Sequence, residues 1–161
     1  MIILDLPVHA IAHARAGDKG DVSNISLIAY LDSGWKVIND LATEERVLDI
    51  FRHLGATQVK RFELPSLKAL NFVIQSALGG GVNSSLRLDR HGKTLSSHLL
   101  HELILPISED MIPSNSPYLK NFKEWKMQEA GSLLVKLLEK QKVDRVFCVP
   151  GESYLSVMNG L

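Results

Sequence analysis

The sequence holds a single cysteine, Cys148, among its 161 residues. One cysteine cannot form an internal disulfide, so a small secreted fold stapled by disulfides is excluded. No apolar run approaches the ~20 residues that a helix needs to cross a bilayer. The N-terminus also shows no basic region followed by a long apolar stretch, as a secretory signal would. We therefore expect a cytoplasmic protein that has no membrane partner.

The chain also lacks a net charge, because 18 acidic residues balance 18 basic ones. The basic residues are scattered along the chain, so the electrostatic footprint of a nucleic-acid-binding protein is missing. Hydrophobic residues make up 45% of the sequence, which suits a globular core. The length gives room for one domain of ordinary size and an appendage.

Residues 15–24, RAGDKGDVSN, are unusually dense in charge and glycine. They lie between two alternating apolar segments, residues 8–14 and 25–30, which favour strands. A plain hairpin needs only a short turn signal, whereas binding groups concentrate in loops that a rigid scaffold holds. We therefore predict a functional loop whose candidate binding residues are Arg15, Asp18, Lys19 and Asn24. The alternative is that the glycines only supply positive-φ backbone and that the charges are solvated.

Strand and helix patterns alternate through the rest of the first 107 residues. Thr43 is a typical helix cap and Gly55 a typical stop, which together predict a helix between them. Residues 70–78 are apolar and fit either a helix or a strand. Alternation predicts strands over residues 58–64, 84–88 and 101–107, and residues 95–100 fit a helical turn. The order of these elements predicts an α+β, ferredoxin-like sandwich, with helices on one face of one sheet.

Three successive glycines, residues 79–81, follow the apolar segment. Their N–H groups are suited to line a concavity that binds an anion. We expect Arg15, Lys19 and Arg87 to lie nearby, so that Lys19 and Gly80 share one pocket for a carboxylate or phosphate. The alternative is a flexible or tightly bent connector. The Gly-Lys-Ser/Thr ending of a P-loop is absent.

The six histidines do not predict a metal site. His9 and His13 would lie ~13 Å apart along one strand, whereas zinc ligands converge at about 2 Å from the ion. His98 and His101 lack an obvious third ligand. Cys148 lies in an apolar run and is expected to behave as a small buried hydrophobe. No catalytic residue is assigned, and we expect no independent catalysis by this chain.

The segments AHARAGDKGDVSNISLIA (residues 12–29) and FELPSLKALNFVIQSALGGGVNSSLRLDRHGK (residues 62–93) carry a family resemblance. Together with the closing strand they resemble the small C-terminal domain of the acyclic terpene utilisation (AtuA-like) proteins. The resemblance spans roughly residues 6–107 and implies a ferredoxin fold. It also implies a domain that is fused to, or encoded beside, a larger AtuA-like subunit.

The resemblance further implies a role in catabolism of branched or terpenoid organic acids or their acyl-CoA esters. The positions that match the family pattern are Arg15, Gly17, Asp18, Lys19, Gly20, Asn24, Asn71, Gly79, Gly80, Gly81 and Arg87. We take Arg15, Lys19 and the glycine amides as contacts for a small anionic organic acid or acyl-CoA, with Asp18 and Asn24 orienting Lys19 or the loop. Ala16 stands where a serine is more usual, so no catalytic hydroxyl is expected there.

The composition changes after residue 107. Prolines, serines and an asparagine in residues 113–117 indicate a linker, placed at residues 108–128. Residues 129–142 then predict an amphipathic helix and residues 143–149 a strand. We expect these to form a helix–strand appendage of residues 129–161 that has no core of its own.

The appendage, EAGSLLVKLLEKQKVDRVFCVPGESYLSVMNGL, resembles the opening of thiamine diphosphate-dependent enzymes of the acetolactate synthase type. The resemblance implies that Glu152 would contact the aminopyrimidine of thiamine diphosphate if the rest of such an enzyme were present. The segment that binds magnesium and the diphosphate is absent from the sequence. We therefore expect no cofactor in this chain, and a truncated lyase or carboligase fragment is kept as an alternative. A purely structural interface module and a homo-oligomer are further alternatives.

Overall fold

The structure is a computed structural model that describes residues 3–120, 137 and 140–142. The chain forms two compact units, Met1–Lys120 and Asn121–Leu161. The strands and the helices α1 to α4 all belong to the first unit. The predicted appendage of residues 129–161, with Cys148 and Glu152, lies outside the described residues except at positions 137 and 140–142.

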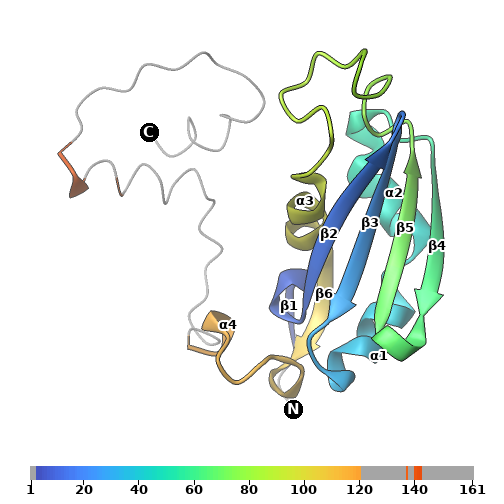
Figure 1. The fold of residues 1–161 in the computed structure, drawn as a ribbon. Helices are drawn as coiled ribbons and strands as arrows, with labels where there is room; N and C mark the ends of the chain where they lie inside the picture. Colours follow the sequence, from blue (N-terminus) through green and yellow to red (C-terminus); the bar gives the residue numbers. More distant parts are fainter. Residues whose placement is uncertain (1–2, 121–136, 138–139, 143–161) are drawn as a thin grey trace. The chain divides into compact units, whose positions relative to one another are not determined.

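The first unit is built on a four-stranded sheet in the order β2-β3-β5-β4. The strands are β2 (Ala12–Lys19), β3 (Val22–Ala29), β4 (Gln58–Leu64) and β5 (Ala69–Gln75), and each neighbouring pair is antiparallel (Figure 1). Ser23, Ile25 and Leu27 are completely buried, while the residues between them are partly exposed. This alternation gives the sheet one buried face and one face open to solvent.

A second, two-stranded ladder pairs the two ends of the domain. Strand β1 (Ile3–Pro7) runs antiparallel to β6 (Ile104–Ser108), so that Leu6 lies opposite Leu105. Short 3-10 turns connect or follow the strands: η1 (Val8–Ala10), η2 (Arg52–Leu54), η3 (Pro65–Leu67) and η4 (Glu109–Met111).

The helices α1 (Asp32–Leu41), α2 (Glu44–Phe51) and α3 (Leu95–Glu102) lie on one side of the four-stranded sheet (Figure 1). Thr43 accepts a hydrogen bond from the backbone N–H of Arg46 and caps α2, as predicted. The Arg61 guanidinium donates to the backbone and side-chain oxygens of Asn39, which ties β4 to α1. Large side chains from both layers form the core, among them Ile38, Phe51, Phe72 and Leu99.

The predicted α+β class is confirmed, with the helices on one face of the main sheet. Several expectations about its elements are wrong. Residues 15–24 are not a loop, because β2 continues to Lys19 and β3 begins at Val22, so that only Gly20 and Asp21 form the turn. Strand β1 and helix α1 were not predicted, and His101 lies in α3 rather than in the last strand.

Residues 84–88 form part of a loop rather than a strand. Leu86 and Leu88 in this loop are 97% and 96% exposed. Between them, Arg87 is partly buried and bonded to the body of the domain. The two leucines whose alternation predicted a strand are therefore exposed to solvent.

Residues 108–120 belong to the first unit, although the sequence predicted a linker from residue 108. Ile112 and Tyr118 are buried, and the Ser33 hydroxyl donates to the backbone oxygen of Asp110 at 3.1 Å. This segment ends in the short helix α4 (Pro117–Lys120). Within the described residues, no helix is both long enough and apolar enough to cross a bilayer.

Candidate functional site: the open face of the sheet

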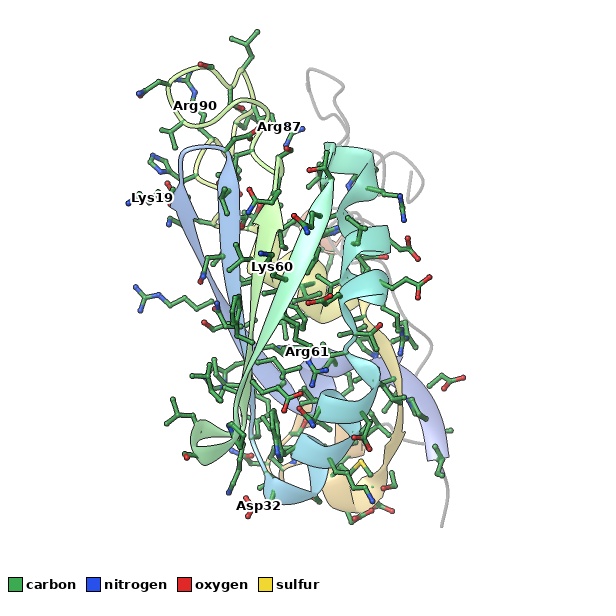
Figure 2. All side chains as sticks on the ribbon, turned by 90° about the vertical axis from the view of Figure 1, so that its right-hand side faces the viewer. Lys19, Asp32, Lys60, Arg61, Arg87 and Arg90 are labelled. Atoms are coloured by element: carbon green, nitrogen blue, oxygen red, sulfur yellow. The ribbon has the colours of Figure 1, made fainter. Side chains whose placement is uncertain are left out.

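The face of the four-stranded sheet that the helices leave uncovered collects several of the predicted site residues. Figure 2 shows Lys19 on the side of the sheet away from the helices. We call this surface the open face. Strand alternation and register place on it Arg15, Gly17, Lys19, Asn24, Ser26, Lys60, Phe62, Asn71 and Val73.

One row across the open face combines a cation, two polar groups and an aromatic ring. Arg15 lies opposite Ser26, Ser26 opposite Asn71, and Asn71 opposite Phe62. The Ser26 hydroxyl donates to Asn71 Oδ1 at 3.0 Å, which fixes the orientation of the Asn71 amide. The amide nitrogen then remains as a donor beside Phe62, which is 51% exposed. The row therefore offers hydrogen-bond donors next to an apolar surface.

The open face is positively charged although the whole chain is neutral. Arg15, Lys19 and Lys60 are exposed and lie on it. None of the three forms an ion pair in the part of the chain that the structure describes. The strand positions that share this face carry no aspartate or glutamate. Uncompensated cations on one face attract anionic ligands or an acidic partner.

Arg15 and Lys19 do not converge on one point by backbone geometry alone. Four residues of strand separate their Cα atoms by ~13 Å. Lys60 lies in the neighbouring row, because it pairs with Val73, which in turn pairs with Asn24. An extended anion, or one with several charged groups, fits this spacing better than a single small carboxylate.

Asp18 points to the opposite side of the sheet from Lys19, because side chains alternate along a strand. Its carboxylate accepts from Lys93 Nζ at 2.5 Å and lies 2.9 Å from His91 Nδ1. The hydrogen bonds from Lys93 and His91 lower the pKa of Asp18. Asp18 thus ties β2 to the loop before α3, and it does not orient Lys19 as the sequence suggested.

The triple glycine contacts the turn of the β2–β3 hairpin. The anion bound there is a side chain of that turn, the carboxylate of Asp21, and not a ligand. Asp21 Oδ1 accepts from the backbone N–H groups of Leu78 and Gly80, each at 3.0 Å. The backbone oxygen of Asp21 accepts from Ala77 N–H at 3.1 Å. The amide of Gly80 is therefore already paired, and the chain's own carboxylate occupies the concavity predicted for a substrate anion.

Arg87 also makes internal bonds. Its two terminal nitrogens donate to the backbone oxygens of Ala77 and Leu54, both at 2.7 Å. These bonds fasten the loop between β5 and α3 (residues 76–94, the glycine-rich loop) to the end of β5 and to η2. Arg87 accordingly has a structural partner for each terminal nitrogen, and Figure 2 shows it at the loop end of the domain.

The structure thus divides the predicted site residues into two groups. The open face carries Arg15, Lys19, Asn24 and Asn71. Near the hairpin turn and in the loop, internal contacts are made by Asp18, Gly80, Gly81 and Arg87. Gly79, in the same loop, is exposed.

The sequence reasoning missed Lys60, Phe62 and Ser26. The alternation in residues 58–64 gave the only signal for the first two, and it did not reveal which strands would be their neighbours. Among residues 3–120 and the few described beyond them, no three histidine, cysteine, aspartate or glutamate side chains gather as metal ligands would.

Comparison with known proteins gives one match. The family model described as the AtuA ferredoxin-like domain matches residues 6–105, and the chain therefore belongs to this family. The match covers the four-stranded sheet, the three long helices and only the inner ends of β1 and β6. It gives no support to the resemblance of the tail to thiamine diphosphate enzymes. No curated protein and no solved structure matches the chain.

Proposed function

We propose that this AtuA-family domain is an accessory domain of a larger AtuA-like subunit, and that its open face holds an anionic organic acid or acyl-CoA at their junction. The observation that carries the proposal is the open face itself. Within the described residues it has three cations without ion pairs and no carboxylate among its strand positions. The domain supplies binding groups, and it works without a cofactor or catalytic residue of its own.

The mixed chemistry of the open face favours an acyl-CoA over a simple inorganic anion. Phe62 and Leu64 on β4 are 51% and 40% exposed and give the face an apolar side. An acyl-CoA combines an apolar acyl chain with several phosphates. The cations are likewise spread out, with Arg15 and Lys19 on β2 and Lys60 on β4 at the other edge of the sheet. Branched or terpenoid acyl groups in a catabolic reaction are the substrates that the family context favours.

The partner has a physical role in this proposal. An exposed cation gains about 0–1 kcal/mol from an ion pair in water. Covering the face with a second subunit removes water and strengthens the same contacts, because charges interact more strongly at lower dielectric. We therefore expect measurable affinity from the assembled complex and weak affinity from this chain alone.

The test compares two lysines that differ mainly in their place on the domain. Lys19→Gln removes a cation from the open face, and Lys36→Gln removes an exposed cation from α1 on the other side. Isovaleryl-CoA is titrated calorimetrically into the complex of this chain with a larger AtuA-like subunit. We expect Lys19→Gln to weaken binding by roughly tenfold, which corresponds to ~1.4 kcal/mol, and Lys36→Gln to leave it unchanged. Equal affinities of the two variants would refute the anion-binding role.

A purely structural interface module is the second candidate, and the exposure of Phe62 and Leu64 favours it. In that case Phe62→Asp separates the two subunits, whereas Lys19→Gln alters neither assembly nor acyl-CoA affinity. Size-exclusion chromatography of both variants with the larger subunit distinguishes the candidates. The ligand-binding proposal requires that Lys19→Gln weakens binding while the complex stays intact.

A further inference from the structure

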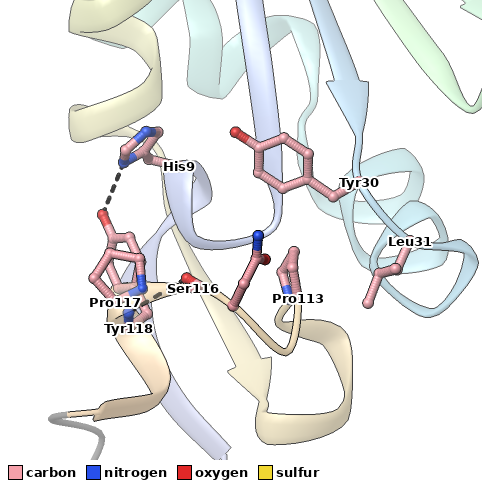
Figure 3. Close-up of a pocket in the computed structure, with 8 residues that line it drawn as sticks. His9, Tyr30, Leu31, Pro113, Ser116, Pro117 and Tyr118 are labelled. Atoms are coloured by element: carbon pink, nitrogen blue, oxygen red, sulfur yellow. Dashed lines mark hydrogen bonds between the residues drawn. The ribbon is translucent and has the colours of Figure 1, made fainter.

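A cavity at the other end of the domain from the glycine-rich loop has a different chemistry. It measures about 440 Å³, within the range of small-molecule sites. Its wall comes from η1, from the two residues after β3, and from the segment that follows η4 (Figure 3). The lining residues are His9, Tyr30, Leu31, Pro113, Asn115, Ser116, Pro117 and Tyr118.

The cavity wall contains no aspartate, glutamate, lysine or arginine side chain among the described residues. Burial, with a smaller effect of the neighbouring His101, lowers the pKa of His9, so its ring is uncharged at neutral pH. Burial raises the pKa of Tyr118, so its phenol keeps its proton. An ion that enters such a cavity loses hydration without gaining a counter-charge, and this cost selects against charged ligands.

The polar groups of the cavity are held in fixed positions. His9 Nδ1 and the Tyr118 hydroxyl oxygen are 3.0 Å apart and form a hydrogen bond, drawn as a dashed line in Figure 3. The two rings meet edge to face with centroids 5.8 Å apart. Ser116 accepts from the Tyr118 backbone N–H, and the Ser116 N–H donates to the backbone oxygen of Pro113.

Apolar surface makes up the rest of the wall. The rings of Tyr30, Pro113 and Pro117 and the side chain of Leu31 line the cavity, and Tyr30 and Leu31 are themselves 44% and 38% exposed. Figure 3 shows Tyr30 across the cavity from the His9–Tyr118 pair. Flat and apolar walls with a few placed polar groups are the usual composition of a small-molecule site.

We propose that this cavity binds an uncharged organic molecule with a planar or branched apolar body and one amide, carbonyl or hydroxyl group that hydrogen-bonds at the His9–Tyr118 pair. The site is separate from the open face, where cations favour anions. It therefore selects the opposite kind of ligand, and its test does not depend on the proposed function.

The experiment uses matched pairs of probes on the full chain. Saturation-transfer NMR measures the binding of benzamide against benzoate and of cyclohexanecarboxamide against cyclohexanecarboxylate. Each pair differs mainly in charge. We expect the amides to bind in the millimolar range, as such small ligands do, and the carboxylates to bind at least roughly tenfold more weakly.

Three variants locate the binding site. Leu31→Trp places a larger side chain at the cavity wall, and Leu86→Trp makes the same change at an exposed leucine in the glycine-rich loop. We expect the first to abolish the benzamide signal and the second to preserve it. Asn115→Trp repeats the filling test from another exposed wall position, and circular dichroism confirms that all three variants fold.

Tyr118→Phe then tests the polar end of the cavity. It keeps the ring and removes the hydroxyl. We expect it to weaken benzamide binding several-fold, which is the effect of losing one hydrogen bond. The proposal is overturned if neither amide binds the wild-type chain, if the carboxylates bind as well as the amides, or if Leu31→Trp and Asn115→Trp bind benzamide like wild type.

Discussion

Gly81 occupies a position where a side chain has no room. Its φ is +90°, and a Cβ atom there would lie 2.9 Å from the backbone carbon and oxygen of Gly20. Both contacts are with backbone, so neither is relieved by a side-chain rotation. We expect Gly81→Ala to lower the free energy of unfolding by about 2–4 kcal/mol, because positive-φ strain of ~1–3 kcal/mol is added to a steric clash. Urea denaturation followed by circular dichroism measures the loss.

Gly20→Ala is the matched control for that substitution. Gly20 also has a positive φ, +60°, but a Cβ atom there would meet nothing within 4 Å. Only the backbone cost remains, so we expect a loss of about 1 kcal/mol. If the two alanine variants unfold at the same urea concentration, the close approach of the hairpin turn to the triple glycine is not a constraint in solution.

His98 gives the domain an acid-sensitive position. Burial lowers the pKa of His98, and in the described part of the chain its Nε2 atom has no hydrogen-bond partner. The unfolded chain therefore takes up a proton near the ordinary value of about 6.5, before the folded domain does. Stability is then full above this pH and is lost as the pH falls through the lower value of the folded state.

Replacing His98 with leucine tests this pH dependence. We expect His98→Leu to lose less thermal stability than wild type when the pH is lowered from 7.5 to 5, because the side chain no longer titrates. His13→Gln, at an exposed histidine of β2, serves as the control and should follow the wild-type profile. Parallel profiles for wild type and His98→Leu would show that His98 is not the sensitive group.

At the scale of the elements, the β2–β3 hairpin is fastened to the triple glycine mainly by Asp21. Its Oδ1 atom accepts from two backbone N–H groups. We expect Asp21→Ala to destabilise the domain by about 1–3 kcal/mol, because the N–H groups of the buried Leu78 and of the exposed Gly80 both lose their acceptor. Hydrogen exchange should accelerate at the amides of Leu78 and Gly80.

Asp21→Asn separates the acceptor from the charge. The asparagine retains one carbonyl oxygen, so we expect a smaller loss of stability and near-normal exchange at the same two amides. An asparagine variant that behaves like the alanine variant would mean that the negative charge, rather than the hydrogen-bond geometry, holds the two segments together.

Local sequence signals predicted some elements well and others poorly. Thr43 and Gly55 mark the helical segment correctly because capping and positive φ depend on a few adjacent residues. The polar composition of residues 15–19 suggested a loop, yet they pair with residues 22–26 because the hairpin needs only two turn residues. The alternation in residues 84–88 predicted a strand, but the backbone there joins neither ladder.

On the scale of the whole domain, the open face could not be predicted from the sequence. Arg15, Asn71 and Lys60 come from three strands, and only the order β2-β3-β5-β4 brings them onto one surface. Resemblance identified Arg15 and Asn71 without placing them. It gave no signal for Lys60, whose position follows from its pairing with Val73. The His9–Tyr118 bond joins residues 109 positions apart, beyond the reach of any local pattern.

Leu86 and Leu88 have a practical consequence for the isolated domain. Arg87 fastens their loop while both leucines stay almost fully exposed. Since burial contributes nothing at either position, we expect Leu86→Ser with Leu88→Ser to leave the melting temperature within about 1 °C of wild type. The double variant should elute earlier from a phenyl column and scatter less light when concentrated.

A loss of several degrees in the double variant would show that the leucines are covered in solution. Otherwise the wild-type chain, purified alone, should be prone to aggregation on storage, and the two serines should make it easier to concentrate for crystals or NMR.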